Sequence, residues 1–155
     1  MTTVAPDPAT RAPRSPAPHR EPSPTLRRAR RVLEVLLLTT LVVSIIHYTD
    51  NTVRWSDYEQ GQGGPVPRWL VPLSWIAFTA AGIGGYVAFR RRRWPLASGL
   101  LGACSVSGLI SPAHYATVAP SDFSGFQNAF VALDTLTGVA LLGFAIWLAL
   151  TGPRL

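Results

Sequence analysis

Four apolar blocks, separated by charged or Pro/Gly-rich stretches, dominate this chain of 155 residues. They cover about residues 32–48, 69–89, 94–115 and 129–150. Each block is close to the roughly 20 apolar residues that a helix needs to cross the hydrocarbon core of a bilayer. The connection between the second and third blocks is very short, so these two spans are expected to be antiparallel neighbours. The sequence therefore predicts an all-α, four-span antiparallel transmembrane helix bundle over residues 27–155.

The first part of the chain has a different composition. Residues 1–26 contain seven prolines among Ala, Thr, Ser and Arg, without apolar periodicity. This composition is typical of disorder, so a disordered N-terminal tail is predicted, and His19 within it is expected to take no part in a site. The arginines that follow resemble the start of a signal peptide. However, no small-x-small cleavage site follows the first apolar block, so this block is expected to stay in the protein.

Arginines near the span ends indicate the orientation. Nine of them fall on one side of the predicted membrane, namely Arg27, Arg28, Arg30, Arg31, Arg90, Arg91, Arg92, Arg93 and Arg154. Only Arg54 and Arg68 fall on the other side. Because cytoplasmic loops carry the excess of basic residues, both termini are predicted to be cytoplasmic. The net charge of +6 is explained by this asymmetry, and no nucleic-acid partner is predicted.

The composition also bears on the source and the chemistry. All fourteen basic residues are arginine, which together with the Ala, Pro and Gly content suggests a GC-rich bacterial genome and hence the inner (plasma) membrane. The single cysteine, Cys104, lies inside the third span and excludes both an intramolecular disulfide and a dithiol redox mechanism within the chain. P-loop, nucleophile-elbow, dinucleotide-binding and EF-hand patterns are all absent.

Two of the predicted spans carry the same polar stripe. The stripes are Thr40, Ser44, His47 and Tyr48 in the first span and Ser107, Ser111, His114 and Tyr115 in the third. The spacing i, i+4, i+7 puts each stripe on one helix face. A Ser-Asp-aromatic triplet follows each stripe, at residues 56–58 and 121–123. This pattern suggests two duplicated helical hairpins related by an axis along the membrane normal. Pro112 is expected to kink the third span just before His114.

Polar side chains near the extracytoplasmic ends of the spans form the predicted site. Its members are His47, Asp50, Asn51, His114, Asn128 and Asp134. Arg54, Asp57, Tyr58 and Glu59 in the following loop would cap it. A second acid, Glu34, lies near the cytoplasmic end of the first span and is expected to reach water or to pair with Arg30 or Arg31.

Among these residues, Asp134 places the strongest requirement on its surroundings. A carboxylate inside a span costs on the order of 2.5 to 3.5 kcal/mol, so it needs a partner, a proton or a water-filled cavity. By depth in the membrane, the nearest candidate partners are His47 and His114. A purely structural use of the same groups stays open, because polar side chains commonly hydrogen-bond across helices in membranes.

The favoured function is non-catalytic. The polar site would bind the head of a lipid-like or small amphipathic ligand between the helices, or a partner subunit. The lipid bilayer is the expected surrounding, and a homo-oligomer or a larger membrane complex is compatible with the Gly-rich helix faces. The cofactor, if any, is not indicated.

Two alternatives remain. The first is metal or haem binding through His47 and His114, although no local ligand pair such as HxxxH supports it. The second is membrane-embedded acid-base catalysis on a lipid, of the isomerase or cyclase type, with Asp134, His47 and His114 as the catalytic groups.

Overall fold

The computed structural model describes residues 23–58 and 67–154, and this part of the chain is helical with no strand. The four long helices are α1 (Pro24–Val53), α2 (Leu70–Arg90), α3 (Trp94–Leu109) and α4 (Gly125–Thr151). The short 3-10 helices are η2 (Ser111–Ala116), η3 (Pro120–Asp122) and η4 (Gly152–Arg154). Most of the predicted tail, with His19, lies outside the described residues, as does Glu59.

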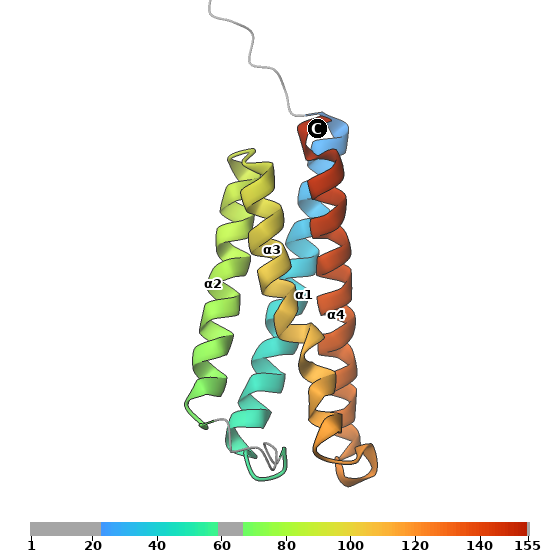
Figure 1. Ribbon diagram of the computed structural model, residues 1–155. Helices are drawn as coiled ribbons and strands as arrows, with labels where there is room; N and C mark the ends of the chain where they lie inside the picture. Colours follow the sequence, from blue (N-terminus) through green and yellow to red (C-terminus); the bar gives the residue numbers. More distant parts are fainter. Residues whose placement is uncertain (1–22, 59–66, 155) are drawn as a thin grey trace, which may run out of the picture.

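Figure 1 shows the four long helices side by side along one axis. The turn between α2 and α3 lies at the same end of the molecule as the start of α1 and the end of α4. The loop after α1 and the 3-10 segments before α4 lie at the opposite end. The first of these ends carries the arginine clusters, and the second carries the predicted polar site.

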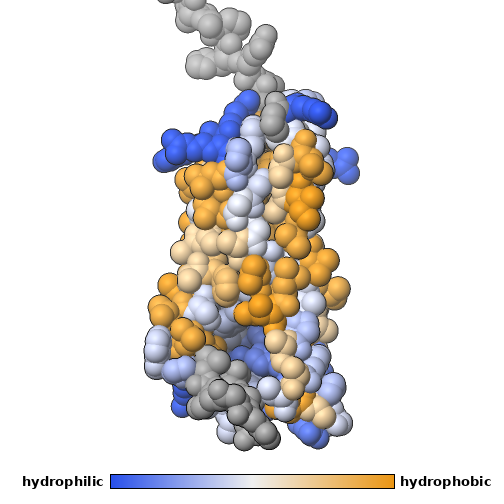
Figure 2. Space-filling view, in the orientation of Figure 1, coloured by the Kyte–Doolittle hydropathy of each residue, from blue (hydrophilic) through white to orange (hydrophobic). Residues whose placement is uncertain are grey.

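Each of the four helices is long and apolar enough to cross a membrane, if η2 is counted with α3. Figure 2 shows apolar side chains over the middle of the molecule and hydrophilic ones toward its ends. Large apolar side chains such as Leu38, Leu136 and Leu150 are 63%, 64% and 71% exposed. A surface of this kind suits lipid and not water. The prediction of an all-helical chain with four apolar, membrane-compatible helices is therefore confirmed.

Two helices begin earlier than the apolar blocks do. α1 starts at Pro24, because the Ser23 hydroxyl caps it by accepting a hydrogen bond from Leu26 N (3.2 Å) and proline suits the first helical position. The predicted tail therefore differs from the structure at its end, since residues 24–26 are helical. α4 starts at Gly125, where Ser124 and Gln127 form a reciprocal capping box.

The third span is broken where a kink is predicted. The α-helix ends at Leu109, and residues 111–116 form the 3-10 helix η2. Pro112 has no amide hydrogen, and its ring crowds the carbonyl of the preceding turn, so an α-helix is not continued through it. The stripe that includes Ser107, Ser111 and His114 therefore does not follow one continuous α-helical face.

Packing differs between the two ends of the bundle. Toward the arginine-rich end the core is apolar and includes Leu33, Phe89, Leu101, Leu141 and Leu148. Toward the other end the buried side chains are largely polar or aromatic. This division places the polar groups that could carry a function in one half of the bundle.

Candidate functional site

The two histidines of the stripes meet at the end of the bundle opposite the arginines. The rings of His47 and His114 lie with their centroids 5.7 Å apart, and His47 is buried. Asn51, one turn beyond His47 on α1, places its Nδ2 3.2 Å from Nε2 of His114, in a hydrogen bond whose direction depends on the histidine tautomer. The structure thus brings together three of the six predicted site residues.

Tyr58 covers these histidines from the loop after α1. Its ring centroid lies 4.9 Å from that of His114 and 6.0 Å from that of His47, and the side chain is fully buried. On its other side Tyr58 packs against Phe123, with centroids 5.3 Å apart. The aromatic residues of the two Ser-Asp-aromatic triplets are therefore in contact, as the two stripe histidines are. We call His47, Asn51, Tyr58, His114 and Phe123 the histidine-tyrosine cluster.

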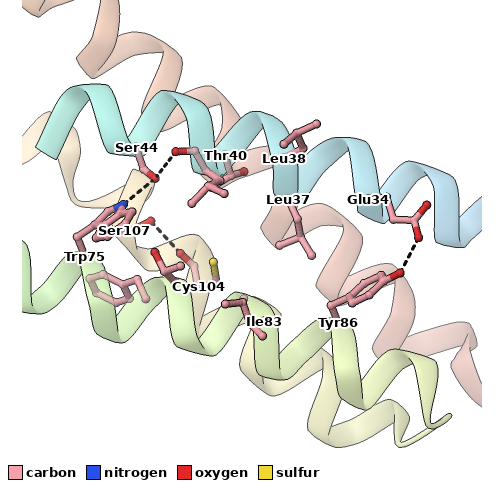
Figure 3. A pocket seen from close by; sticks show the side chains of 14 residues that line it. Glu34, Leu37, Leu38, Thr40, Ser44, Trp75, Ile83, Tyr86, Cys104 and Ser107 are labelled. Atoms are coloured by element: carbon pink, nitrogen blue, oxygen red, sulfur yellow. Dashed lines mark hydrogen bonds between the residues drawn. The ribbon is translucent and has the colours of Figure 1, made fainter. Parts of the chain in front are cut away.

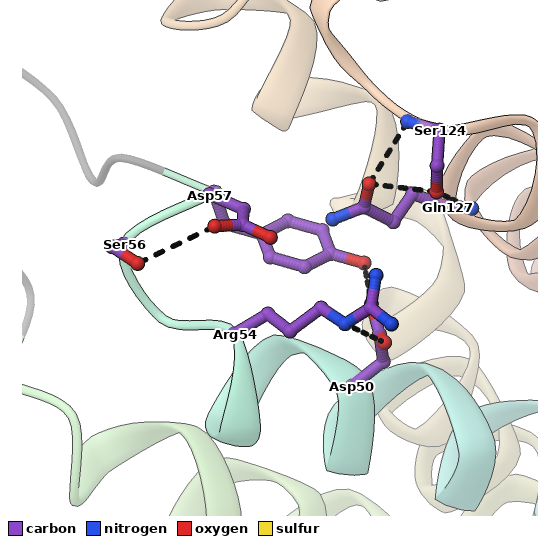
Figure 4. A network of polar contacts seen from close by, with 7 residues as sticks. Asp50, Arg54, Ser56, Asp57, Ser124 and Gln127 are labelled. Carbon is purple, nitrogen blue, oxygen red and sulfur yellow. Dashed lines mark hydrogen bonds and ion pairs between the residues drawn. The ribbon is translucent and has the colours of Figure 1, made fainter.

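Asp50 belongs to this end but faces the loop. Its Oδ2 accepts a hydrogen bond from the Tyr58 hydroxyl at 2.8 Å, and its Oδ1 lies 3.4 Å from Nε of Arg54 (Figure 4). Asp57 accepts instead from the neighbouring Ser56 hydroxyl. The carboxylate of Asp50 therefore holds Tyr58 in place, and among the described contacts it makes no hydrogen bond to His47, whose Nδ1 is buried without a partner.

The other two predicted site residues lie apart from the histidines. Asn128 accepts a hydrogen bond from the Tyr115 hydroxyl at 2.8 Å and donates to the carbonyl of Pro120 at 2.9 Å, so it fastens the segment before α4. Asp134 is fully buried, and its Oδ2 accepts a hydrogen bond from the Ser111 hydroxyl at 2.6 Å. The expected pairing of Asp134 with a histidine is not among its contacts.

The histidine-tyrosine cluster offers little to a metal ion. Within residues 23–58 and 67–154, no group of three or more His, Cys, Asp and Glu side chains is placed to hold one. The space around the two imidazoles is taken by Asn51 and by the Tyr58 ring. The arrangement closes this end of the bundle with rings and hydrogen bonds.

Tyr58 lies outside the membrane-spanning helices, and it is expected to ionise at a higher pH than a free tyrosine. Burial, followed by the hydrogen bond to the Asp50 carboxylate, raises the pKa of Tyr58 above its ordinary value of about 10. A pKa that is raised on folding contributes stability that is complete below about pH 10 and is lost as pH rises through the folded-state pKa. We expect the tyrosinate absorbance that Tyr58→Phe removes to develop only above about pH 10, the ordinary pKa of tyrosine. Equal titration curves for both proteins below that pH would agree with this, whereas a difference near pH 10 would contradict it.

A separate cavity of about 310 Å³ lies between α1, α2 and α3 (Figure 3). Glu34 and Tyr86 line one end of it, and Thr40, Ser44, Trp75 and Ser107 line the part toward the histidine-tyrosine cluster. Between them the lining is apolar, with Leu37, Leu41, Phe78 and Ile83. The sequence did contain a signal for this cavity, because Thr40, Ser44 and Ser107 are the inner members of the two stripes. The α2 wall also carries polar groups on one helix face, at Trp75, Thr79 and Tyr86, which are spaced i, i+4 and i+11.

Most polar groups in the cavity wall already have partners. Trp75 Nε1 donates to the Ser44 hydroxyl at 3.2 Å, which itself donates to the carbonyl of Leu41 at 3.2 Å. The Ser107 hydroxyl donates to the carbonyl of Cys104 at 2.9 Å. Thr40 is different, because its hydroxyl is buried and has no hydrogen-bond partner.

The arginine-side end of the cavity is closed by a charged network. Oε1 of Glu34 accepts hydrogen bonds from the Tyr86 hydroxyl at 2.6 Å and from Arg30 Nε at 2.7 Å. The guanidinium of Arg90 lies over the Tyr86 ring, 5.9 Å from its centroid. Glu34 thus pairs with Arg30 as the sequence suggests, and it also forms part of the cavity wall. The chain as a whole matches no protein-family model, no curated protein and no solved structure, so any function must be inferred from these residues themselves.

Proposed function

We propose that this chain is a membrane protein that binds a small, uncharged, lipid-like molecule in the cavity between α1 and α2. The observation that carries the proposal is an apolar cavity of about 310 Å³ with one buried, unpartnered hydroxyl, that of Thr40, in its wall. Its volume is at the lower end of the range of roughly 300 to 1,000 Å³ that is typical of small-molecule sites. The ligand is therefore smaller than a complete phospholipid.

The lining supports an apolar body for the ligand and a route from the bilayer. Leu37 and Phe78 present hydrocarbon to the cavity. Leu38 and Ile83 also line it, and both are more than half exposed on the lipid-facing surface. The cavity thus lies at the boundary between the protein and the acyl chains, where a lipid-soluble molecule is concentrated.

The polar groups support a hydrogen-bond acceptor on the ligand. A buried hydroxyl without a partner is unfavourable, by roughly 1 to 3 kcal/mol, and a ligand oxygen would relieve this. Because the hydroxyls of Ser44 and Ser107 already donate to carbonyls, Thr40 is the buried hydroxyl donor that remains for a ligand. The partly exposed hydroxyl of Thr79 lines the same cavity. A carbonyl or hydroxyl oxygen is the matching group.

The ion-paired Glu34 at one end of the cavity supports an uncharged ligand. The carboxylate of Glu34 is satisfied by Arg30 and Tyr86, so it offers no unpaired charge to the cavity. In this proposal the six residues that the sequence predicts as a head-group site have a different role. Those in the histidine-tyrosine cluster close the end of the bundle, one helical turn beyond the polar part of the cavity.

The proposal includes the setting predicted from the sequence. We propose an antiparallel four-span bundle in a bacterial inner membrane, built of two related hairpins, with both termini in the cytoplasm. The nine arginines at one end support this orientation. The contacts of His47 with His114 and of Tyr58 with Phe123 support the relation between the hairpins, because each pair joins equivalent positions.

Benzophenone is a suitable probe, because it is a small apolar ketone that forms covalent bonds to nearby C–H groups under ultraviolet light. We expect saturable photolabelling of the purified protein on the cavity-lining segments of α1 and α2, mapped by peptide mass spectrometry. Thr40→Val should raise the half-saturating concentration roughly fivefold, since one hydrogen bond contributes about 1 kcal/mol. The matched control is Thr39→Val, which changes the neighbouring exposed threonine and should leave labelling unchanged.

A cavity-filling variant separates the cavity from the general lipid-facing surface. Thr79→Leu adds volume to the cavity wall and should abolish the saturable labelling, whereas Ala80→Leu on the exposed side of α2 should not. Labelling that is unsaturable, or that is the same in Thr79→Leu as in the wild type, would show that the cavity is not a binding site.

A further inference from the structure

Asp134 is a buried acid that the proposed ligand cavity does not use. Its side chain is fully buried on α4, with Oδ2 on the Ser111 hydroxyl and Oδ1 without any hydrogen-bond partner. It lies nine residues after the first residue of α4 and is fully buried, so water cannot solvate a charge there as it does at the membrane surface.

The groups that surround Asp134 bring no positive charge. α4 packs against α1, α3 and η2. The titratable groups that interact with Asp134 from these elements are Tyr48 of α1 and Cys104 of α3, and both are uncharged in their ordinary form at neutral pH. η2 contributes Ser111. Within the described part of the chain, no basic side chain is among the groups that interact with Asp134.

The two histidines do not supply the missing charge either. His47 and His114 contact one another and Tyr58, and Asn51 is hydrogen-bonded to His114. A carboxylate in hydrocarbon surroundings without a cationic partner is strongly unfavourable and is relieved when it takes up a proton.

We propose that Asp134 and Ser111 form a proton-binding site inside the membrane, in which Asp134 holds its proton in the packed bundle at neutral pH. The hydrogen-bond geometry accommodates that proton. Ser111 Oγ lies 2.6 Å from Asp134 Oδ2 and 3.4 Å from the carbonyl oxygen of Ser107. A protonated Asp134 can therefore donate to the Ser111 hydroxyl, and this hydroxyl can donate to the carbonyl of Ser107. The carboxyl proton and the hydroxyl proton then each have an acceptor.

The fold provides a place where this proton can be exchanged. Ser111 begins η2, beyond the point where α3 ends, and it is followed by Pro112. In contrast, Gly108 and Gly138 hold α3 and α4 in backbone contact immediately below. An ionised Asp134 would need access to water, which a movement of η2 away from α4 would give.

Infrared spectroscopy tests the site without a ligand, since a protonated carboxyl group absorbs at a different frequency from a carboxylate. The other acids of the described residues have different surroundings: Asp50 and Glu34 form ion pairs, and Asp57 and Asp122 are exposed. We expect the wild type to show one protonated-carboxyl C=O band at neutral pH that Asp134→Asn removes. The band should shift in frequency in Ser111→Ala, which loses the hydrogen bond to the Asp134 carboxyl group.

Three outcomes would overturn the proposal: a wild-type spectrum without the band at neutral pH, a band that remains in Asp134→Asn, or one that is lost near about pH 4 like that of an exposed acid. If Asp134→Asn does not accumulate, Asp134→Glu is used to assign the protonated-carboxyl band, because the band must then move in frequency. The outcome is independent of the benzophenone experiment, since the infrared band requires no occupied cavity.

Discussion

Replacing Gly108 with alanine is expected to lower the free energy of unfolding by about 3 kcal/mol, because the new Cβ has no room. It would overlap the main-chain carbonyl of Asp134 and come within 3.1 Å of Cα of Gly138. Both neighbours are backbone atoms of α4, so no side chain can rotate away and the two helices must separate. Unfolding of the purified protein in detergent, followed by helical circular dichroism, measures the loss.

Gly102→Ala is the matched control for this substitution. Gly102 also lies on α3, and a Cβ atom there meets nothing within 4 Å. Because alanine favours a helix over glycine by roughly 0.8 to 1 kcal/mol, this variant is expected to be unchanged or slightly more stable. Equal stability of the two variants would show that α3 and α4 are not in backbone contact at Gly108.

Replacing Tyr58 with alanine should destabilise the histidine end of the bundle by about 3 to 5 kcal/mol, as large aromatic deletions in cores do. The ring is fully buried and contacts His47, His114 and Phe123, and its hydroxyl binds the carboxylate of Asp50. Its removal would leave a cavity and expose both imidazoles to water. Equilibrium unfolding and hydrogen exchange of the surrounding amides would report the loss.

Tyr58→Phe separates packing from hydrogen bonding at the same position. It keeps the ring and removes only the hydrogen bond to Asp50, which still lies near Arg54. We expect a loss of about 1.5 to 3 kcal/mol, the usual contribution of a hydrogen bond to a charged group. If Phe and Ala were equally destabilising, the ring contacts would contribute nothing and the loop would not be held as described.

Gly108 and Tyr58 have different structural roles in the bundle. The Gly108 contact sets the distance between α3 and α4 and so keeps Asp134 from lipid and water. Tyr58 covers the histidines and thereby contacts both α1, at His47, and η2, at His114. The cavity between α1, α2 and α3 is lined by neither of these residues, and the Thr40 hydroxyl in its wall has no hydrogen-bond partner.

Some helix ends were readable from the sequence in principle. Ser23 followed by proline, and Ser124 followed three residues later by Gln127, are local signatures of a helix start. The apolar blocks alone put these starts several residues later, because the first residues of α1 include arginines and those of α4 include Gln127 and Asn128. Hydrophobicity shows which segment lies in lipid, whereas capping shows where the helix begins.

The sequence by itself determined the four membrane-compatible helices, because the length and hydrophobicity of a segment are properties of that segment alone. It also placed polar groups at one end of the bundle and arginines at the other. Pairing was decided only by the tertiary structure. Which side chains of two helices meet depends on their rotation and separation, and here these are set by the Gly108–Gly138 contact and by the break at Pro112. For that reason Asp134 meets Ser111, whereas Asp50 meets Tyr58 through the loop that follows α1, and neither carboxyl group is hydrogen-bonded to a histidine.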